Sequence, residues 1–361
     1  MRILYDGQIF RLQPAGGINR YFASLISRLP QDDIPTIAGA GRRPVNFPTH
    51  PNLRLNRLLP VLPGRFSGAY LRHARPPFPT WDVAHPTYYQ LTRETRYSDY
   101  KMPVVVTAHD FIHALYPDLM IESKAVAAQQ TEAFEAAAAI ICVSQNTRND
   151  LLSFFPHLEN KTTVIYHGIE VSGDLPAASE SVPEEPYFLY VGSRSSYKNF
   201  NRLLVSFAKA CNSDPTLRLC VAGPDFSESE RWLIFDLGLK ERILSVRHPS
   251  DAHLTALYRH SLALLYPSRY EGFGIPPLEA MACGTVAVTS NTSSLPEVVG
   301  DAGITLDPMN PDDWTDIILH LARSPEIRQP FIEKGKLQSA KFTWEETARQ
   351  TVAVYQKVQN L

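Results

Sequence analysis

Short apolar runs alternate with helical segments along the chain, and this alternation limits the possible folds more than any other feature. In the first half, the pattern predicts strands at 3–5, 103–107 and 139–143. Helices are predicted at 18–29, 123–138 and 144–154, where apolar residues recur at helical spacing or a cap residue opens the run. Short continuous apolar strands separated by helices are typical of a parallel sheet covered on both faces.

The alternation stops at 170–186, a stretch rich in acidic residues and prolines, and then starts again. Strands are predicted at 187–191, 217–222, 243–246, 262–265 and 286–289, with helices at 201–210, 228–237 and 251–260. A length of 361 residues also favours two domains. We therefore expect an α/β chain with a first domain at 1–170, a linker at 171–186 and a second domain at 187–342. A strong helix at 343–361 could pack back on the first domain.

Composition excludes several classes of protein. Lys and Arg number 35 against 37 Asp and Glu, so the chain is not a polycation that coats nucleic acid. The four cysteines form no CxxC pair, which argues against a zinc site and a disulfide framework. The N-terminus lacks the pattern of a signal peptide, and no apolar run approaches the roughly 18 residues of a membrane span. A cytoplasmic protein is expected.

The segment EGFGIPPLEA at 271–280 is the strongest local signal for chemistry. Gly272 and Gly274 let backbone amides approach a ligand closely. Pro276 suits the first turn of a following helix, whose N-terminus favours a phosphate. Glu271 and Glu279 supply carboxylates that accept hydrogen bonds from hydroxyl groups. These features predict a site for a molecule with hydroxyls and a phosphate, although an ordinary strand-to-helix turn would carry the same residues.

Three further groups lie where parallel strands are predicted to end or a helix to begin. Arg194 and Lys198 follow the strand at 187–191, Gly16 and Gly17 precede the first long helix, and His109 follows the strand at 103–107. Ligands of doubly wound sheets collect at the carboxyl ends of the strands. Taken alone, each group has an ordinary explanation: solvated cations, a tight turn, or a histidine bonded to backbone.

Six segments, in order, resemble the retaining glycosyltransferases of family 4, which have the GT-B fold. EGFGIPPLE is similar to the EX7E motif of that family. The other five are PAGGINRYF, TAHDFIH, VSQNTRNDL with VIYHGIE, YVGSRSSYKNF and SSLPEVVGDAGI. The resemblance covers nearly the whole chain. It implies two Rossmann-like doubly wound domains that face each other across a cleft, with the donor bound by the second domain.

The resemblance also implies roles for the residues of the EX7E segment. Glu279 would bind the ribose of a nucleotide-sugar donor, and Glu271 a hydroxyl of its sugar. The amides of Phe273 and Gly274 would contact the same sugar, and the amide of Ile275 would lie near the diphosphate.

Other roles follow from the same resemblance. Arg194 and Lys198 would bind the diphosphate, where fixed cations stabilise the leaving group. Arg194 lies one position later than in many members of the family. The segment that includes Val246 would hold the base, mainly through backbone atoms. Gly16 and Gly17 would lie beside the donor phosphate and the acceptor, and His109 would contact the donor sugar or orient an acceptor hydroxyl.

No cofactor and no metal ion are expected beyond the donor substrate. The chain contains no Asp-any-Asp triplet to bridge a divalent cation to the diphosphate, and the two cations can replace it. Metal-independent catalysis is therefore predicted. Retention of anomeric configuration comes only from the resemblance, and front-face attack is the expected route because the two glutamates have binding roles in the family.

The acceptor side is predicted from residues 53–75, which mix arginines with leucines and aromatics. The surrounding residues 34–81 contain no acid. Such a surface suits an anionic membrane or a lipid-linked acceptor, and equally a loop whose leucines fill a core. It has few stacking aromatics, which argues against nucleic acid. Peripheral contact at the inner face of the membrane is one expectation.

The expected reaction transfers a hexose from a nucleotide donor to a glycan or a lipid-linked acceptor in polysaccharide biosynthesis. UDP-glucose is the favoured donor because UDP-sugars are common, and a GDP-mannose-dependent mannosyltransferase is the alternative. An epimerase or hydrolase on the same scaffold would turn over donor without acceptor. A binding protein without catalysis would have no need for the two cations and two glutamates together.

Overall fold

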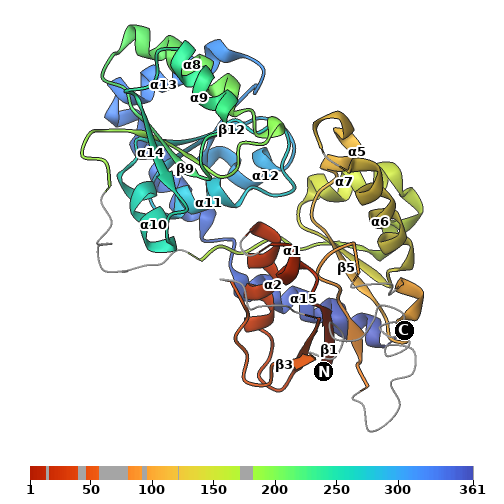
Figure 1. Cartoon of the computed structure of the whole chain (residues 1–361). Helices are drawn as coiled ribbons and strands as arrows, with labels where there is room; N and C mark the ends of the chain where they lie inside the picture. Colours follow the sequence, from red (N-terminus) through yellow and green to blue (C-terminus); the bar gives the residue numbers. More distant parts are fainter. Residues whose placement is uncertain are drawn as a thin grey trace. The chain divides into compact units, whose positions relative to one another are not determined.

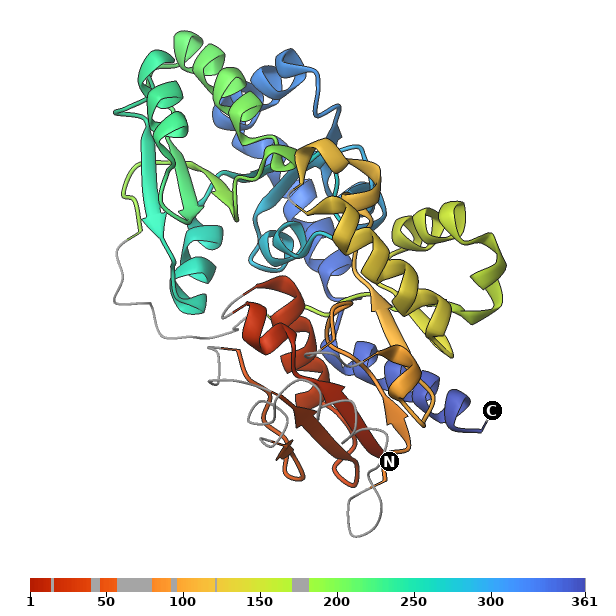
Figure 2. The ribbon, with the colours of Figure 1, turned by 45° about the vertical axis from the view of Figure 1, so that its right-hand side comes forward.

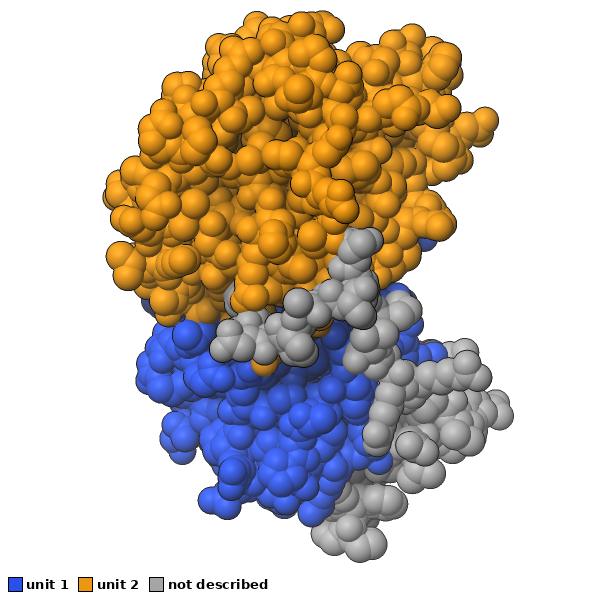
Figure 3. Space-filling view, turned by 90° about the vertical axis from the view of Figure 1, so that its left-hand side faces the viewer, with its two compact units in different colours: residues 1–168, 343–361 blue, residues 169–342 orange. Residues whose placement is uncertain are grey.

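The computed structural model describes residues 1–13, 16–39, 46–56, 80–91, 96–120, 122–170 and 182–360. The chain divides into two compact units, coloured separately in Figure 3. Unit 1 consists of residues 1–168 and 343–361, and unit 2 consists of residues 169–342. Most of the predicted linker, residues 171–181, lies outside the described residues, as do residues 57–75 of the predicted acceptor surface.

Unit 1 contains these elements: β1 Arg2–Asp6, α1 Ile9–Leu12, α2 Gly17–Ser27, β2 Ile34–Ala38, β3 Arg54–Asn56, β4 Val83–Ala84, η1 Tyr97–Asp99, β5 Val105–Ala108, α5 Ile112–Leu115, η2 Pro117–Leu119, α6 Ser123–Ala136, β6 Ala139–Cys142, α7 Gln145–Phe154, η3 Pro156–Lys161, β7 Thr162–Val164 and α15 Trp344–Gln359. Its strands are all parallel, in the orders β3-β2-β1-β4 and β5-β6-β7. A bridge between Ala84 and Val104 joins β4 to the second group.

Alternate residues of the unit 1 strands face two cores. Ile3 and Tyr5 of β1 pack with α2 and α15, whereas Leu4 packs in a second cluster that holds Phe134 of α6 and Leu151 of α7. Helices therefore cover both faces of the sheet, as buried parallel strands require. The C-terminal helix α15 completes the first core through Trp344 and Tyr355, both fully buried. Figures 1 and 2 show this helix beside β1 and α2.

Unit 2 contains these elements: β8 Phe188–Val191, η4 Ser196–Lys198, α8 Phe200–Ser213, β9 Leu219–Gly223, α9 Glu228–Asp236, β10 Ile243–Arg247, α10 Asp251–His260, β11 Ala263–Tyr266, α11 Ile275–Ala282, β12 Val286–Ser290, α12 Leu295–Val299, η5 Gly300–Ala302, β13 Ile304–Leu306, α13 Pro311–Arg323 and α14 Pro325–Ser339. Its six strands are parallel, in the order β10-β9-β8-β11-β12-β13.

The unit 2 sheet is also covered on both faces. Phe188 and Tyr190 of β8 pack with α8 and α13, whereas Tyr187 and Leu189 pack with α10 and α11. Figure 1 shows α8 and α13 together on one side of this sheet. The predicted fold class, two Rossmann-like doubly wound domains, is confirmed. None of the helices in the described ranges is both long and apolar enough to cross a membrane.

Several elements were not predicted from the sequence. β3, β4, β7 and β13 have only two or three residues each, too few for a periodic pattern to appear. β2 was missed because its sequence, IPTIA, contains a proline and follows a turn-rich segment. Helix α14 has few buried residues and an internal proline, Pro330, which hides its helical pattern.

Candidate functional site

The unit 2 sheet reverses its strand order between β8 and β11. From β8 the chain builds outward to β9 and β10, and it then crosses to β11 on the other side of β8. In doubly wound sheets, ligands bind outside the carboxyl ends of the strands at such a switch point. The segment after β8 carries Lys198, and the segment after β11 carries Glu271. Two residues that lie 73 positions apart in sequence therefore meet at the expected location.

Lys198 and Glu271 form a two-point ion pair at the switch point. The Lys198 Nζ atom lies 2.6 Å from Oε1 and 2.8 Å from Oε2 of Glu271. It also donates to the Tyr266 hydroxyl at 3.3 Å. The side chains of Lys198 and Glu271 are only 13% and 11% exposed. Such a pair is held by charge-assisted hydrogen bonds and is weakly screened by salt.

The surroundings keep Lys198 charged. Burial by itself would lower the pKa of Lys198, but the Glu271 carboxylate, with contributions from Tyr266 and Tyr197, raises that pKa well above its usual range. The ammonium is therefore a permanent cation at neutral pH. A fixed cation in a partly dehydrated site is suited to stabilise the charge of a diphosphate.

The backbone around Glu271 is fixed by two serines that open the next helical segment. The Glu271 N–H donates to the Ser293 hydroxyl at 3.0 Å. The buried Ser294 hydroxyl donates to the carbonyl oxygens of Glu271 and Phe273 at 2.9 and 2.7 Å. Both serines belong to the SSLPEVV segment, so this segment holds the EX7E loop in place.

Helix α11 begins at Ile275 as the sequence predicts, with Pro276 and Pro277 in its first turn. Prolines have no N–H group, so the donors at this helix start are limited mainly to the amides before them. Gly274 precedes the helix with φ 109°, a conformation that favours glycine. A Cβ atom at this position would lie 2.7 Å from a methyl carbon of Leu295.

The second glutamate of the motif lies inside α11. Glu279 is 8% exposed, and the buried Tyr258 hydroxyl donates to its Oε2 atom at 3.0 Å. Tyr258 belongs to α10, so this contact joins two helices on one face of the sheet. Glu271 and Glu279 thus have different supports: a cation for the first and a phenol for the second.

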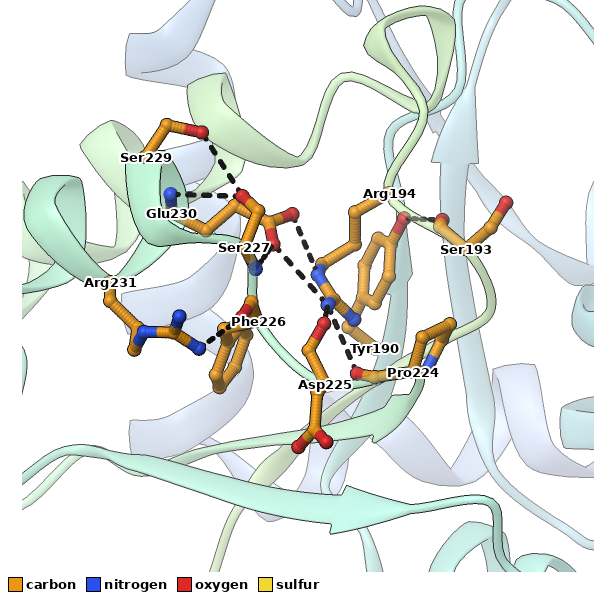
Figure 4. A network of polar contacts seen from close by, with 10 residues as sticks. All are labelled: Tyr190, Ser193, Arg194, Pro224, Asp225, Phe226, Ser227, Ser229, Glu230 and Arg231. Atoms are coloured by element: carbon orange, nitrogen blue, oxygen red, sulfur yellow. Dashed lines mark hydrogen bonds and ion pairs between the residues drawn. The ribbon is translucent and has the colours of Figure 1, made fainter.

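Arg194 has a different environment from Lys198. Its Nε atom lies 2.8 Å from Oε1 of Glu230, and its Nη2 atom donates to the carbonyl oxygens of Pro224 and Asp225 at 3.0 and 2.7 Å. These partners all lie between the end of β9 and the first turn of α9. The guanidinium also lies over the ring of Phe226, and the side chain is only 4% exposed. Figure 4 shows this network. That Arg194 binds a diphosphate remains a prediction.

The remaining unit 2 residues are placed as follows. Val246 lies near the end of β10, which is an edge strand of the sheet. The His248 N–H next to it donates to the Gly223 carbonyl oxygen at 3.2 Å, and His248 has φ 44°. Gly272 lies in the loop between β11 and α11, directly after Glu271.

Gly16, Gly17 and His109 belong to unit 1. Gly17 opens helix α2, and a Cβ atom there would meet no described atom within 4 Å. In the same first turn, Asn19 is fully buried, and its Oδ1 and Nδ2 atoms have no hydrogen-bond partner among the described residues. A buried amide without partners is costly, so its presence points to a ligand.

His109 follows β5 as predicted and is 7% exposed. Its ring contacts the ring of Tyr21 from α2 edge-on, with centroids 5.4 Å apart. Burial, with His167 and His85 nearby, lowers the pKa of His109 well below its usual range. The imidazole is therefore neutral at pH 7, which suits hydrogen bonding to a hydroxyl rather than binding an anion.

His85, which follows β4, was not predicted from the sequence. Its Nδ1 atom lies 2.6 Å from the Tyr355 hydroxyl, and its Nε2 atom lies 2.8 Å from Thr107 Oγ1. Burial lowers the pKa of His85 to about 3. The strand before it has two residues, so no pattern marked this histidine. Asn19, Tyr258 and Glu230 were also missed, although Ser227 and Glu230 have the spacing of a helix capping box.

Within the described ranges, no group of three or more His, Cys, Asp or Glu side chains is arranged to hold a metal ion. The four cysteines are all free thiols.

Two family descriptions match the chain, one for each half. "Glycosyltransferase Family 4" matches residues 15–172, and "Glycosyl transferases group 1" matches residues 173–338. The boundary between them falls close to the boundary between the two units.

Curated relatives are glycosyltransferases as well. The chain is 30% identical to the O-antigen chain mannosyltransferase B of Escherichia coli over 244 residues, which cover 62% of each chain. It is 24% identical to the D-inositol 3-phosphate glycosyltransferase of Streptosporangium roseum over 384 residues, covering 94% of this chain and 88% of the relative. The chain thus spans less than two thirds of the first of these relatives.

The fold is shared with solved glycosyltransferase structures. HepE of Anabaena, solved in complex with UDP and glucose, superimposes with a TM-score of 0.74 at 16% sequence identity. The alignment covers 99% of this chain and 100% of HepE. At this level of identity the likeness shows the GT-B fold.

Proposed function

We propose that this chain is a retaining glycosyltransferase that moves a hexose from a nucleoside diphosphate sugar to a glycan or a lipid-linked acceptor. The observation that carries the proposal is the Lys198–Glu271 pair at the switch point of unit 2. The ammonium and the carboxylate are both partly buried, and Glu271 belongs to the loop that leads into helix α11. The family descriptions and the relatives support the same reaction class.

In this proposal each side chain has a distinct task. Lys198 donates to the diphosphate and stabilises the negative charge that the leaving nucleoside diphosphate gains. Glu271 accepts a hydrogen bond from a hydroxyl of the donor sugar and keeps Lys198 protonated. Glu279, held by Tyr258, accepts from the ribose. The amides of Phe273, Gly274 and Ile275 donate to the sugar and the diphosphate.

The reaction needs no metal ion in this proposal, because Lys198 supplies the positive charge at the diphosphate. Attack comes from the face that the leaving group occupies, and a donor phosphate oxygen takes the acceptor proton. No covalent glycosyl-enzyme is formed, so mass spectrometry of the enzyme under turnover should detect no sugar adduct.

UDP-glucose is the donor that we favour, in line with the UDP and glucose bound to HepE. GDP-mannose is the second candidate, and the names of the O-antigen mannosyltransferases among the relatives support it. The acceptor belongs to polysaccharide biosynthesis in both cases.

The test is a thermal-shift panel of the whole chain with UDP, GDP, ADP and CDP, each with and without EDTA. A ligand that binds only the folded state raises the melting temperature by mass action. A rise with UDP that survives EDTA is expected, and a GDP-selective rise would select the mannose donor. Absence of any shift, confirmed by calorimetric titration, would refute a donor site in unit 2. Radiolabelled donor then tests transfer, and sugar release without acceptor would indicate a hydrolase.

A further inference from the structure

We infer that Arg194 is a positioning residue, which fixes the backbone beside the nucleoside end of the donor and does not contact the diphosphate. This inference rests on the proposed function and concerns the same nucleotide site. It changes the role of one of the two cations that the sequence assigns to the diphosphate.

Two of the three guanidinium nitrogens of Arg194 are already bonded inside the protein. Two guanidinium nitrogens bind Glu230, and one of them also binds the Pro224 and Asp225 carbonyl oxygens. The third, Nη1, has no hydrogen-bond partner among the described residues, but it is buried and lies 3.5 Å from the position that a Cβ atom would take at Gly223. With 4% of the side chain exposed and Nη1 itself buried, a ligand could reach an N–H group of Arg194 only if this network opened.

The flanking groups make the network rigid. Glu230 also accepts from the Ser227 N–H at 2.7 Å, and the Ser227 hydroxyl caps α9 in return. Partial burial tends to raise the pKa of Glu230, but the hydrogen bonds from Arg194 and Ser227 outweigh it and lower that pKa below its usual range. The guanidinium lies over the ring of Phe226, with its carbon 4.6 Å from the ring centroid. Figure 4 shows Glu230 and the two carbonyl groups converging on it.

The segment that Arg194 holds is connected to the end of β10. The Asp225 carboxylate pairs with Arg247 at 3.2 Å, and the Gly223 carbonyl oxygen accepts from the His248 N–H. Residues 246–248 are the segment predicted to hold the base. Arg194 therefore links the loop that leads to Lys198 with the backbone beside the base.

Lys198 differs from Arg194 in every respect that matters for a ligand. It lies at the switch point, its acidic partner is the sugar-binding glutamate of the motif, and both side chains keep more than a tenth of their surface exposed. The structure therefore assigns the diphosphate to one cation, with Arg194 one position away from the place that the family pattern gives it.

The experiment measures the affinities of UDP and UMP, or of GDP and GMP if guanine binds, by calorimetry with the whole chain. The variants are Arg194→Gln, Arg194→Lys, Glu230→Gln, the double variant Arg194→Gln with Glu230→Gln, and Lys198→Gln as reference. The Arg194 and Glu230 variants should weaken the binding of both nucleotides by the same factor, about tenfold. The ratio of diphosphate affinity to monophosphate affinity should therefore stay within about twofold of wild type.

Lysine keeps the charge but not the planar fork of donors, so Arg194→Lys should resemble Arg194→Gln. The double variant should be no worse than either single variant, because both remove one network. Lys198→Gln should lower the ratio about tenfold or more, because it removes a phosphate contact. Asn310→Ala, which removes the side-chain cap of α13 elsewhere in unit 2, controls for loss of stability, and it should lower the melting temperature while the affinities stay unchanged.

The inference is overturned if Arg194→Gln lowers the ratio as Lys198→Gln does while Arg194→Lys and Glu230→Gln preserve it. It is also overturned if none of the Arg194 and Glu230 variants changes either affinity. If an Arg194 variant fails to fold, Glu230→Gln carries the test, because it removes the charge and one acceptor oxygen from the network while Arg194 keeps its two carbonyl partners. Failure of the proposed function looks different: the wild-type chain would then bind none of the four nucleotides.

Discussion

The Lys198 ammonium contacts both carboxylate oxygens of Glu271, and these two residues follow the two strands between which the sheet reverses its order. The pair therefore joins the loop after β8 to the loop after β11. A ligand that enters between these loops would replace part of the ion pair with its own phosphate and hydroxyl groups. The following predictions depend on this arrangement and on its neighbours.

Substitution of Lys198 by Gln should reduce donor turnover about 10²–10³-fold, because the leaving diphosphate loses its cation. Glu271→Gln should also lower turnover and, by leaving an ammonium partly buried without its partner, lower the melting temperature. Steady-state kinetics and thermal denaturation check both. The matched control is Lys209→Gln, whose lysine pairs with Asp312 on the exposed surface and should leave turnover unchanged. Retention of most activity by Lys198→Gln would disprove the role.

Replacing Tyr258 by Phe removes the hydroxyl that holds the Glu279 carboxylate. One hydrogen bond to a charged group is worth about 1.5–3 kcal/mol, so the Kd of the nucleotide should rise about tenfold or more while kcat changes little. Tyr187→Phe is the control, because that buried hydroxyl donates to the carbonyl oxygen of Leu257 and not to a carboxylate. Equal effects of the two substitutions on Kd would show that Glu279 does not bind the ribose.

Alanine at Gly274 should disturb the start of α11 more than backbone strain alone explains. The added Cβ would lie 2.7 Å from a Leu295 methyl carbon, in addition to the cost of φ 109°. Gly238→Ala is the control, since Gly238 has φ 67° and no atom within 4 Å of its Cβ position. Backbone strain of roughly 1–2 kcal/mol should lower the melting temperature of both variants. Only Gly274→Ala should also lose nucleotide affinity. Equal loss in both would contradict the steric explanation.

Asn19 should matter for activity and not for stability. Its side-chain amide forms no hydrogen bond within the described chain, so Asn19→Ala removes no internal bond and should leave the melting temperature unchanged or slightly higher. Donor turnover should fall if a ligand pairs with this amide. Gln130→Ala is the contrasting variant, because Gln130 donates to the Asp110 carbonyl oxygen and its loss should destabilise unit 1. A lower melting temperature with normal turnover for Asn19→Ala would refute this assignment.

Stability should decrease in mild acid because of the buried histidines. The pKa of His85 is lowered by burial to about 3, below its value of about 6.5 in the unfolded chain. The unfolded state therefore binds more protons between pH 6.5 and 3, and the free energy of unfolding falls as pH falls through this range. Each such histidine contributes about 1.4 kcal/mol per pH unit.

Urea denaturation at pH 7, 6 and 5 measures this effect. His85→Gln should be less stable at pH 7, because it loses hydrogen bonds, but its stability should depend less steeply on pH. The control is Gln130→Ala, which removes a hydrogen bond from unit 1 but no titratable group and should leave the slope unchanged. Parallel slopes for wild type and His85→Gln would refute the titration argument.

The sequence predicted five of the strands of unit 2 and their carboxyl ends well, because buried parallel strands are continuous apolar runs. Lys198 and Glu271 could be selected because each follows such a strand. Their direct contact could not be predicted, since it depends on β8 and β11 being neighbours, which is a property of the strand order. The partners of Arg194 were hidden for the same reason: Arg194 lies in the loop after β8, and Glu230 lies on helix α9, 36 residues away.

Unit 1 was predicted less completely. Its strands β2, β3 and β4 are short or contain proline, so His85 had no visible strand before it. The sequence also could not predict that the Asn19 side chain is buried without a hydrogen-bond partner among the described residues, because burial depends on packing in three dimensions. The serines that hold the EX7E loop were quoted as part of a motif, but only the structure shows which carbonyl groups they bind.

The return of α15 to unit 1 has a consequence for how the protein folds during synthesis. Trp344, Val352, Tyr355 and Val358 belong to the same core as β1 and α2, yet the ribosome makes them after all of unit 2. Domains ordinarily fold in the order in which they emerge. Here unit 2 can close its core before α15 has been made. Unit 1 must wait, with an apolar face uncovered, for a helix that begins more than 340 residues after its first strand.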